Sequence, residues 1–219
     1  MKEIFKVGLP AALEQVIFQI GITAFLILVA YYGTEAYAAY GIGVQILSFS
    51  FVIGFGFSIA GATLVGQHLG AKNKNQAKRA GWGAMRLSIV SMTFFGVIIA
   101  TFAEPLARFM IDNDEVVRLT VIFIWLLGSM QPLMAIEFSL GGALRGAGDT
   151  KTPLAITLTC LLFIRVFLAV IFFLLDASIE IIFSTLLADY IVKGFLYVSR
   201  FRSDKWMNVL KIKEVDQQP

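Results

Sequence analysis

Two glutamates lie inside long apolar stretches of this 219-residue chain, where an ionisable side chain needs a partner or a use. Glu14 lies seven residues past Val7, the start of one predicted membrane span, and Glu137 lies seven residues before Leu144, the end of another. A helix rises about 1.5 Å per residue, so each carboxylate is expected roughly 10 Å from the same membrane surface. Two carboxylates that share one cavity of low dielectric would not both ionise at neutral pH, which suits them to hold a proton or a cation. Alternatively, each acid only accepts hydrogen bonds from a neighbouring span or faces a water-filled crevice.

Other polar side chains in the apolar stretches extend this set of candidates. Four glutamines either bind a substrate or cation or hydrogen-bond between helices: Gln15, Gln19, Gln45 and Gln131. Arg165 and Asp189 are predicted near the midplane of consecutive antiparallel spans, where we expect a structural ion pair. Lys193, one turn after Asp189, either shares that carboxylate or extends to the membrane surface. Pro10 and Pro132 are expected to kink their helices.

The residue types needed for most enzyme chemistry are scarce. His68 is the only histidine and Cys160 the only cysteine, and neither metal-ligand spacing nor a nucleotide-binding glycine-rich loop with Lys-Ser/Thr occurs. We therefore expect no enzyme, no metal site and no cofactor other than a coupling ion. The net charge of +3 could suggest nucleic acid, but the basic residues cluster in loops on one side, which favours membrane topology instead.

Composition and hydropathy predict an all-α membrane protein. The chain is 58% hydrophobic and 15% charged, with a mean hydropathy of +0.80, and its apolar residues come in long runs. Six spans are expected, at about residues 7–30, 37–69, 82–102, 119–144, 153–175 and 179–199. Residues 200–219 are expected to form a basic amphipathic cytosolic tail whose Trp206, Met207, Val209 and Leu210 lie on the membrane surface.

Lysine and arginine are distributed unevenly between the two predicted sides. Fifteen of the eighteen fall on the side of both chain ends and of the loops near Lys72 and Arg145. Arg108 and Arg118 lie on the other side, and Arg165 lies between the two sides, near the midplane of the membrane. Because cytosolic loops carry an excess of basic residues, both termini are expected in the cytosol.

Three stretches together resemble the multidrug and toxic compound extrusion (MATE) family of sodium- or proton-coupled efflux transporters. They are GLPAALEQ at Gly8–Gln15, GATLVGQHLGA at Gly61–Ala71 and GGALRGAGDTKTP at Gly141–Pro153. The last two place Gln67 and the Arg145/Asp149 pair at equivalent cytosolic helix ends. Members are usually about twice this length, with two six-helix lobes around a substrate cavity. The chain, apart from its tail, looks like the C-terminal lobe alone.

The resemblance also implies where a cation site in this lobe would lie. Such members place an acid on the first span where this chain has Phe18, and an aspartate on the fourth span where it has Met134. Glu14 precedes Phe18 by one turn and Glu137 follows Met134 by three residues, and both displacements point toward the cytosol because the two helices run oppositely. We expect an acidic site shifted by one turn, with both carboxyl groups facing a common cavity.

The resulting expectation is a half-size secondary active antiporter, multi-pass in the inner (cytoplasmic) membrane. It would export amphipathic or cationic drugs in exchange for sodium or protons, together with a second lobe that is a separate chain or another copy. One alternative is a non-transporting fragment or assembly subunit of a split transporter, because the chain starts near where a full-length member's central linker would end. A further alternative is a flippase for lipid-linked sugars, which would need a cationic cavity, whereas only Arg165 is expected to be a buried cation.

Overall fold

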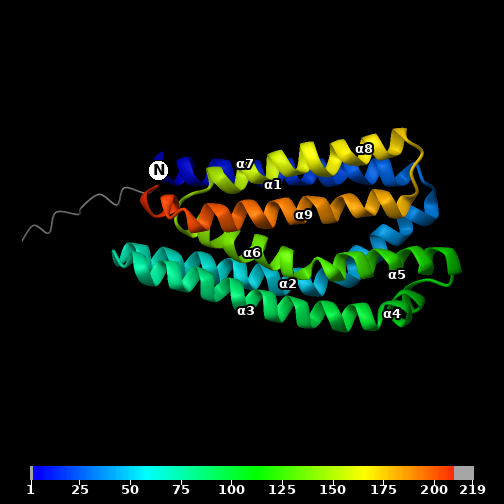
Figure 1. Ribbon diagram of the computed structural model, residues 1–219, viewed down its shortest axis with the longest axis horizontal. Helices are drawn as coiled ribbons and strands as arrows, with labels where there is room; N and C mark the ends of the chain where they lie inside the picture. The colour runs from blue at the N-terminus through cyan, green and yellow to red at the C-terminus, as the bar shows by residue number, and fades with distance from the viewer. Residues whose placement is uncertain (1, 210–219) are drawn as a thin grey trace, which may run out of the picture.

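The computed structural model describes residues 2–209, with side chains from Gly8 onward, and this part of the chain is helical and contains no strand (Figure 1). The helices are α1 (Lys2–Ala30), α2 (Thr34–Gly70), α3 (Lys74–Thr101), α4 (Ala103–Met110), α5 (Asp114–Ser129), α6 (Gln131–Gly146), α7 (Lys151–Thr159), α8 (Phe167–Leu174) and α9 (Ile179–Arg202). A π-helical segment, Cys160–Val166, joins α7 to α8, and a short 3-10 turn, Lys205–Asn208, follows α9. Within the described residues, five helical stretches are long and apolar enough to cross a membrane, with α7, the π-helical segment and α8 counted as one. The number is six if the bent pair of α5 and α6 is one span. The expected all-α membrane fold is confirmed.

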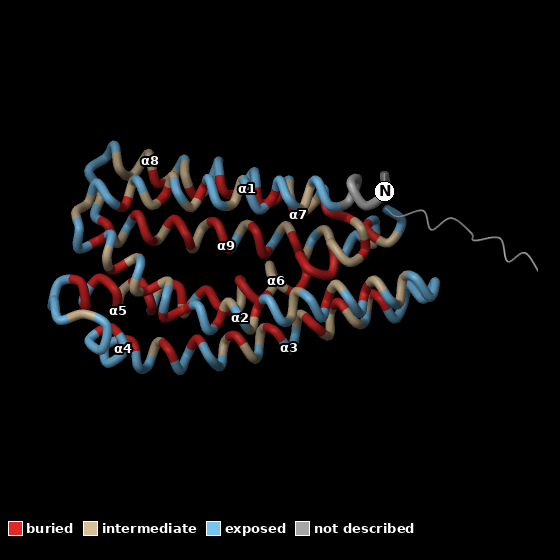
Figure 2. Tube along the Cα trace, turned by 180° about the vertical axis from the view of Figure 1, so that it is seen from behind, coloured by how far each residue is buried: buried red, intermediate tan, exposed pale blue. Residues whose placement is uncertain are grey.

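The helices form two groups that α9 holds together. Helices α2, α3, α5 and α6 pack against one another, while α1 packs along the span made by α7, the π-helical segment and α8. Helix α9 lies between the groups and contacts α5, α6 and the π-helical segment. Figure 2 shows the resulting burial, with buried positions concentrated along α9 and on the inner sides of the other helices.

The span made by α5 and α6 bends by 53° at Met130. Pro132 is the second residue of α6, a position where a missing backbone N–H removes no helical hydrogen bond. In a straight helix this proline would instead leave the Gly128 carbonyl without a donor, so the break lies just before it. Helix α1 continues on both sides of Pro10, and a kink there stays a prediction.

Close packing of α2 against α6 explains the glycines of the two longer motifs. A Cβ atom on Gly142 would overlap the backbone of Ser58, and one on Gly146 would overlap the backbone of Ala62. A Cβ atom on Gly61 would come within 2.9 Å of the Ser139 carbonyl oxygen. Without the hydrophobic drive that water provides, membrane helices gain stability by such close contact, which small residues permit. The motif glycines therefore fix the distance between α2 and α6.

The chain after α9 differs from the expected surface tail. Trp206 is fully buried, its ring stacks on Phe201 at a centroid distance of 4.6 Å, and its indole N–H donates to the Phe201 carbonyl oxygen at 2.9 Å. A ring in the core cannot lie on the membrane surface, so the expectation for Trp206 was wrong. Val209 is exposed, and Leu210 with the rest of the tail lies outside the described residues.

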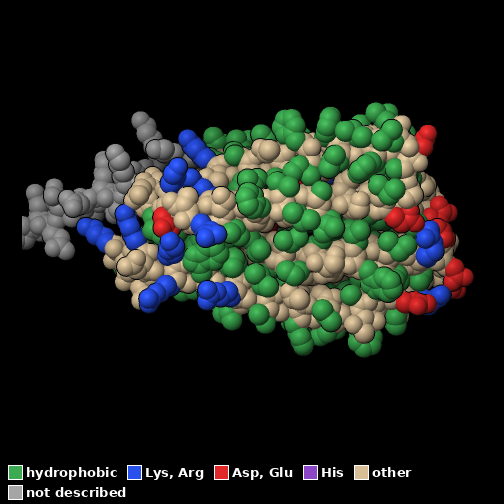
Figure 3. All heavy atoms as spheres, in the orientation of Figure 1, with side chains coloured by type: hydrophobic (Ala, Val, Ile, Leu, Met, Phe, Trp, Pro, Cys, Tyr) green, Lys and Arg blue, Asp and Glu red, His purple; other side chains and the backbone are tan. Residues whose placement is uncertain are grey.

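Charged residues gather at the two ends of the bundle. Lys and Arg dominate the end that holds the N-terminus, the α2–α3 and α6–α7 connections and the end of α9 (Figure 3). We call it the basic end. The opposite end carries acidic residues that pair with Arg108 and Arg118, including Glu104 and Glu115.

Replacing Gly142 with Ala is expected to destabilise the chain, because the added methyl group overlaps Ser58 and overpacking costs about 1–3 kcal/mol. Gly56 is the matched control on α2, since no neighbouring atom lies within 4 Å of its would-be Cβ. Gly56→Ala should be neutral or slightly stabilising, because Ala favours a helix by about 1 kcal/mol. The measurement is the thermal midpoint of the detergent-solubilised chain. Equal midpoints for the two variants would show that the close α2–α6 contact is dispensable.

Candidate functional site

Two adjoining cavities lie between α1, α2, α6 and α9. The smaller, about 110 Å³, is lined by Glu14, Gln15, Ser58, Glu137, Arg145 and Thr157 together with four aromatic side chains. The larger, about 280 Å³, is lined mainly by aromatic and aliphatic groups and by Arg165. Four aromatic residues line both: Phe18, Phe55, Phe138 and Tyr190. The two glutamates therefore face one cavity, at the polar margin of an apolar one.

Glu14 is held by three hydrogen bonds. The Arg145 guanidinium donates from Nε to Oε2 at 3.2 Å and from Nη2 to Oε1 at 2.5 Å, a two-point geometry. The Thr157 hydroxyl donates to Oε1 at 3.3 Å. These contacts link α1 to α6 and α7, and they leave the Glu14 side chain only 5% exposed. Glu14 is thus a fixed ionic contact between helices.

Glu137 lies at the end of a chain of alternating charges. Lys193 Nζ is 3.5 Å from Glu137 Oε1 and 3.2 Å from Asp189 Oδ2, and Arg165 Nη2 is 3.0 Å from the same Asp189 oxygen. The predicted group of Arg165, Asp189 and Lys193 is thus brought together, with Glu137 as a fourth member. Lys193 is fully buried and shares the Asp189 carboxylate rather than extending to the surface.

Within this chain of charges the two carboxylates differ in accessibility. The Asp189 side chain is completely buried between two cations, whereas the Glu137 side chain is 21% exposed and contacts one. Lys193 Nζ also lies 5.9 Å from the Phe18 ring centroid and 5.3 Å from that of Tyr190, within the range of cation–π attraction. Glu137 is therefore the group at which an ion from the cavity could replace a protein partner.

The π-helical segment carries the Arg165 end of this group. Such segments insert one residue into a turn and recur at functional sites. Here the segment interrupts the predicted fifth span and contains the buried Arg165, which faces Asp189 on α9.

Arg145 and Asp149, two charged residues of the family motif, bind different partners. Arg145 binds Glu14, while Asp149 Oδ2 accepts from Arg200 Nε at 2.8 Å and from Nη2 at 2.6 Å. The Thr152 hydroxyl donates to Asp149 Oδ1 at 2.8 Å. The turn between α6 and α7 points the two motif side chains in different directions, so each joins a different helix to the bundle.

The turn itself depends on one glycine. Gly148 has φ of +80°, a conformation that side chains disfavour, and the Asp149 N–H closes the helix end on the Leu144 carbonyl at 2.9 Å.

The four candidate glutamines have different positions. Gln15 lines the smaller cavity, whereas Gln19 and Gln45 are exposed and line neither cavity. Five residues rotate a helix by about 140° beyond a full turn, which points Gln19 away from Glu14. Gln131 is fully buried at the start of α6, and its amide has no hydrogen-bond partner within the described part of the chain. The motif residue Gln67 is exposed near the end of α2.

The family positions Phe18 and Met134 both line the larger cavity. The two carboxylates line the smaller cavity, which Phe18 lines as well, and the one-turn displacement stays a prediction. Sequence reasoning did not identify which aromatic residues form the walls, above all Phe138 and Tyr190. A usable signal was their adjacency to the charged residues Glu137 and Asp189, since both are immediate sequence neighbours.

The buried cations also differ from expectation. Lys193 is fully buried like Arg165, and Arg145 is partly buried, so Arg165 is not the only one. Of the two alternatives for Lys193, the structure shows the shared Asp189 carboxylate, and the side chain does not extend to the surface. Each of the three cations faces a carboxylate, so the cavities do not carry uncompensated positive charge.

A family model described as MatE matches residues 10–171, most of the chain. The chain belongs to the MatE family. "Probable multidrug resistance protein NorM" of Thermotoga maritima is 36% identical over 214 residues, covering 94% of this chain and 44% of that protein. The protein of the same name from Mannheimia succiniciproducens is 30% identical over 161 residues, covering 73% of this chain and 34% of that protein. The chain thus spans less than half the length of these MatE relatives.

Solved structures share the fold of this MatE chain. The structure described as "MATE transporter ClbM in complex with Rb+" gives a TM-score of 0.87 at 20% identity, covering 94% of this chain and 49% of that one. An outward-facing multidrug resistance MATE family transporter gives a TM-score of 0.82 at 18% identity, covering 96% of this chain and 47% of that one. In each case the similarity covers about half of the larger protein.

The pairing of Glu137 with Lys193 is expected to be a cooperative contact. Glu137→Gln and Lys193→Met should each destabilise the chain, because each leaves one net charge in the buried group of Arg165, Asp189, Lys193 and Glu137, and the double variant should lose less than the sum. We expect a coupling energy on the order of 1–3 kcal/mol from unfolding in detergent. Additive effects would mean that the 3.5 Å approach contributes nothing measurable.

Proposed function

We propose that this chain is one lobe of a secondary active efflux transporter that exchanges a proton or sodium ion for an amphipathic cationic compound. The observation that carries the proposal is the placement of Glu137, which is partly exposed in the polar cavity and shares one buried lysine with Asp189. The multidrug resistance names of the relatives and the MATE transporter folds support the same class of activity.

Ion coupling in this proposal depends on competition at Glu137. A proton or sodium ion that reaches the carboxylate displaces Lys193, which keeps Asp189 as its counter-ion. A cationic substrate competes for the same carboxylate, so ion and substrate exclude one another. Glu14 is assigned a supporting role, because Arg145 and Thr157 already occupy its oxygens. The family relative described as a complex with Rb⁺ supports a monovalent cation as a ligand of this fold.

The substrate in this proposal binds against the aromatic cavity. This cavity, the larger of the two, has a volume of about 280 Å³, slightly below the roughly 300–1,000 Å³ of typical small-molecule sites. We infer that a second six-helix lobe, either another copy or a separate chain, supplies the facing wall. The coverage of less than half of each full-length relative supports this arrangement.

The orientation proposed for the lobe places the basic end in the cytosol. Lysine and arginine gather there, and the positive-inside rule favours that side for short basic loops (Figure 3). The carboxylate cavity then lies nearer the cytosolic surface of the inner membrane. A flippase for lipid-linked pyrophosphates is a weaker proposal, since Arg145, Arg165 and Lys193 each already face a carboxylate.

Transport tests this proposal directly. The full chain, alone and with a candidate first lobe, is reconstituted in vesicles, and efflux of a fluorescent cationic dye is driven by a sodium or proton gradient. Glu137→Gln should lower gradient-driven efflux by at least about tenfold, equivalent to roughly 1.4 kcal/mol. Glu35→Gln, an exposed glutamate on the first turn of α2, is the matched control and should transport normally.

Three results would count against the mechanism. Unchanged coupling in Glu137→Gln would remove Glu137 from it, and dye movement that ignores both gradients would remove coupling itself. Absence of transport in every combination, with the chain folded, would favour a non-transporting assembly subunit.

We also expect this chain to associate with a second lobe. In mild detergent the chain should be dimeric, or should bind a co-expressed first lobe, because a lobe that provides half of a cavity exposes a face suited to another. The measurement is mass by light scattering with the detergent subtracted. A monodisperse monomer that also fails to bind any candidate lobe would contradict the two-lobe arrangement.

A further inference from the structure

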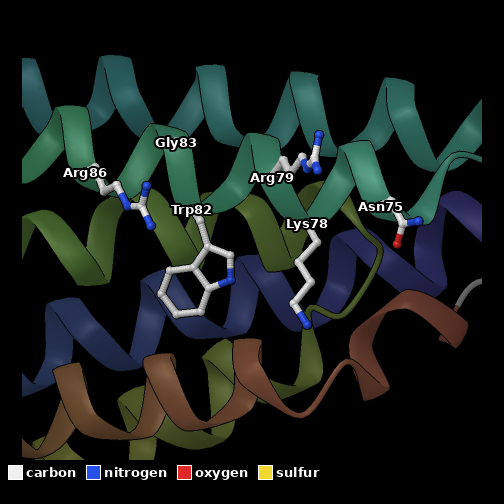
Figure 4. A pocket seen from close by; sticks show the side chains of 6 residues that line it. All are labelled: Asn75, Lys78, Arg79, Trp82, Gly83 and Arg86. Carbon is white, nitrogen blue, oxygen red and sulfur yellow. The ribbon is translucent and has the colours of Figure 1, made fainter.

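A basic depression lies on α3 at the basic end, on a different part of the surface from the cavities described above. It has a volume of about 580 Å³ and is lined by Asn75, Lys78, Arg79, Trp82, Gly83 and Arg86. These positions recur every three or four residues, so they share one side of the helix. Figure 4 shows Lys78, Trp82 and Arg86 leaving the same side of α3, with the indole ring between the two basic side chains.

The positive charge of this depression is only partly compensated. Lys78 Nζ binds Asp204 Oδ2 at 2.7 Å. Arg79 and Arg86 are exposed, and within the described residues neither has a carboxylate at ion-pair distance. The Cα atoms of Arg79 and Arg86 are about 10 Å apart along the helix axis, and both guanidinium groups are available to an external anion.

The indole ring of Trp82, between Lys78 and Arg86, is held in place by contact with core residues. Trp82 packs edge-on against Phe201 at a centroid distance of 5.3 Å, and Phe201 stacks on the buried Trp206. Tryptophan is enriched where hydrocarbon meets the polar headgroups of a bilayer. Trp82 thus marks the depth of that boundary on α3 and gives the depression a rigid wall.

An apolar stripe continues from the depression toward the middle of the membrane. Val90, Phe94 and Val97 follow Gly83 and Arg86 at helical spacing, and their exposed fractions are 68%, 61% and 59%. The eleven helical steps from Arg86 to Val97 span about 16 Å, which is close to half of the roughly 30 Å hydrocarbon core. The stripe therefore has the length of one leaflet.

We propose that this face of α3 is a binding site for an anionic phospholipid, with the headgroup phosphate between Arg79 and Arg86 and an acyl chain along Val90, Phe94 and Val97. The guanidinium groups supply charge and paired N–H donors for phosphate oxygens. The stripe contacts the acyl chain, which a soluble phosphate lacks. Basic pockets at membrane-spanning helices recognise acidic headgroups by the same physics. The site is independent of the proposed transport activity.

Native mass spectrometry of the full, delipidated chain tests the site, with phosphatidylglycerol and phosphatidylcholine titrated in matched detergent. We expect phosphatidylglycerol to bind at least about tenfold more tightly than phosphatidylcholine. The double variant Arg79→Gln/Arg86→Gln should lose this preference. The control Lys72→Gln/Lys151→Gln removes the same charge from exposed positions that do not line the depression, and it should retain the preference.

Competition with a soluble phosphate ester distinguishes binding of the headgroup from binding of the acyl chain. Glycerol phosphate should compete at least about tenfold more weakly than phosphatidylglycerol, because it lacks the acyl chains that the stripe would bind. Equal competition would overturn the lipid assignment. Equal binding of the two lipids, or equal loss in the control variant, would overturn the site itself. Unchanged thermal midpoints of both double variants verify that folding is not the cause.

Discussion

The cost of placing charge in a membrane organises the interior of this chain. Each of four largely buried carboxylates, Glu14, Glu137, Asp149 and Asp189, faces a lysine or arginine from another helix or from the next turn of its own. An unpaired charge at such depth is unfavourable by several kcal/mol, so the pairs constrain which helices are adjacent. The charges thereby specify the packing of α1, α6, α7, the π-helical segment and α9.

The pairs differ in how completely they satisfy their carboxylates. Glu14 receives three hydrogen bonds, and Asp149 receives bonds from both Arg200 and Thr152. The contacts of Glu14 and Asp149 therefore act as structural links between helices. Glu137 has one approach from Lys193 at 3.5 Å and open surface on its cavity side. Among the four largely buried carboxylates, Glu137 is therefore the one at which replacing the protein partner by an incoming ion costs least.

Glycine packing sets the scaffold on which these charges sit. The motif glycines bring α2 within backbone contact of α6, which carries both Glu137 and Arg145. The bend at Met130 then redirects α5 by 53° relative to α6. Most of the exposed basic residues lie at one end of the bundle, where the guanidinium groups of α3 adjoin an apolar stripe.

The sequence by itself determined the all-α membrane class, because long apolar runs exclude other folds, and it placed Glu14 and Glu137 at one depth, because helical rise is constant. It also indicated the group of Arg165, Asp189 and Lys193 from depth alone. Only the tertiary structure decided which partner each charge takes, since depth leaves rotation about each helix axis open. That rotation gave Arg145 and Asp149 their separate partners, turned Gln19 and Gln45 outward, and joined Glu137 to Lys193. It also drew Trp206 into the core, where packing against Phe201 overrode its amphipathic pattern.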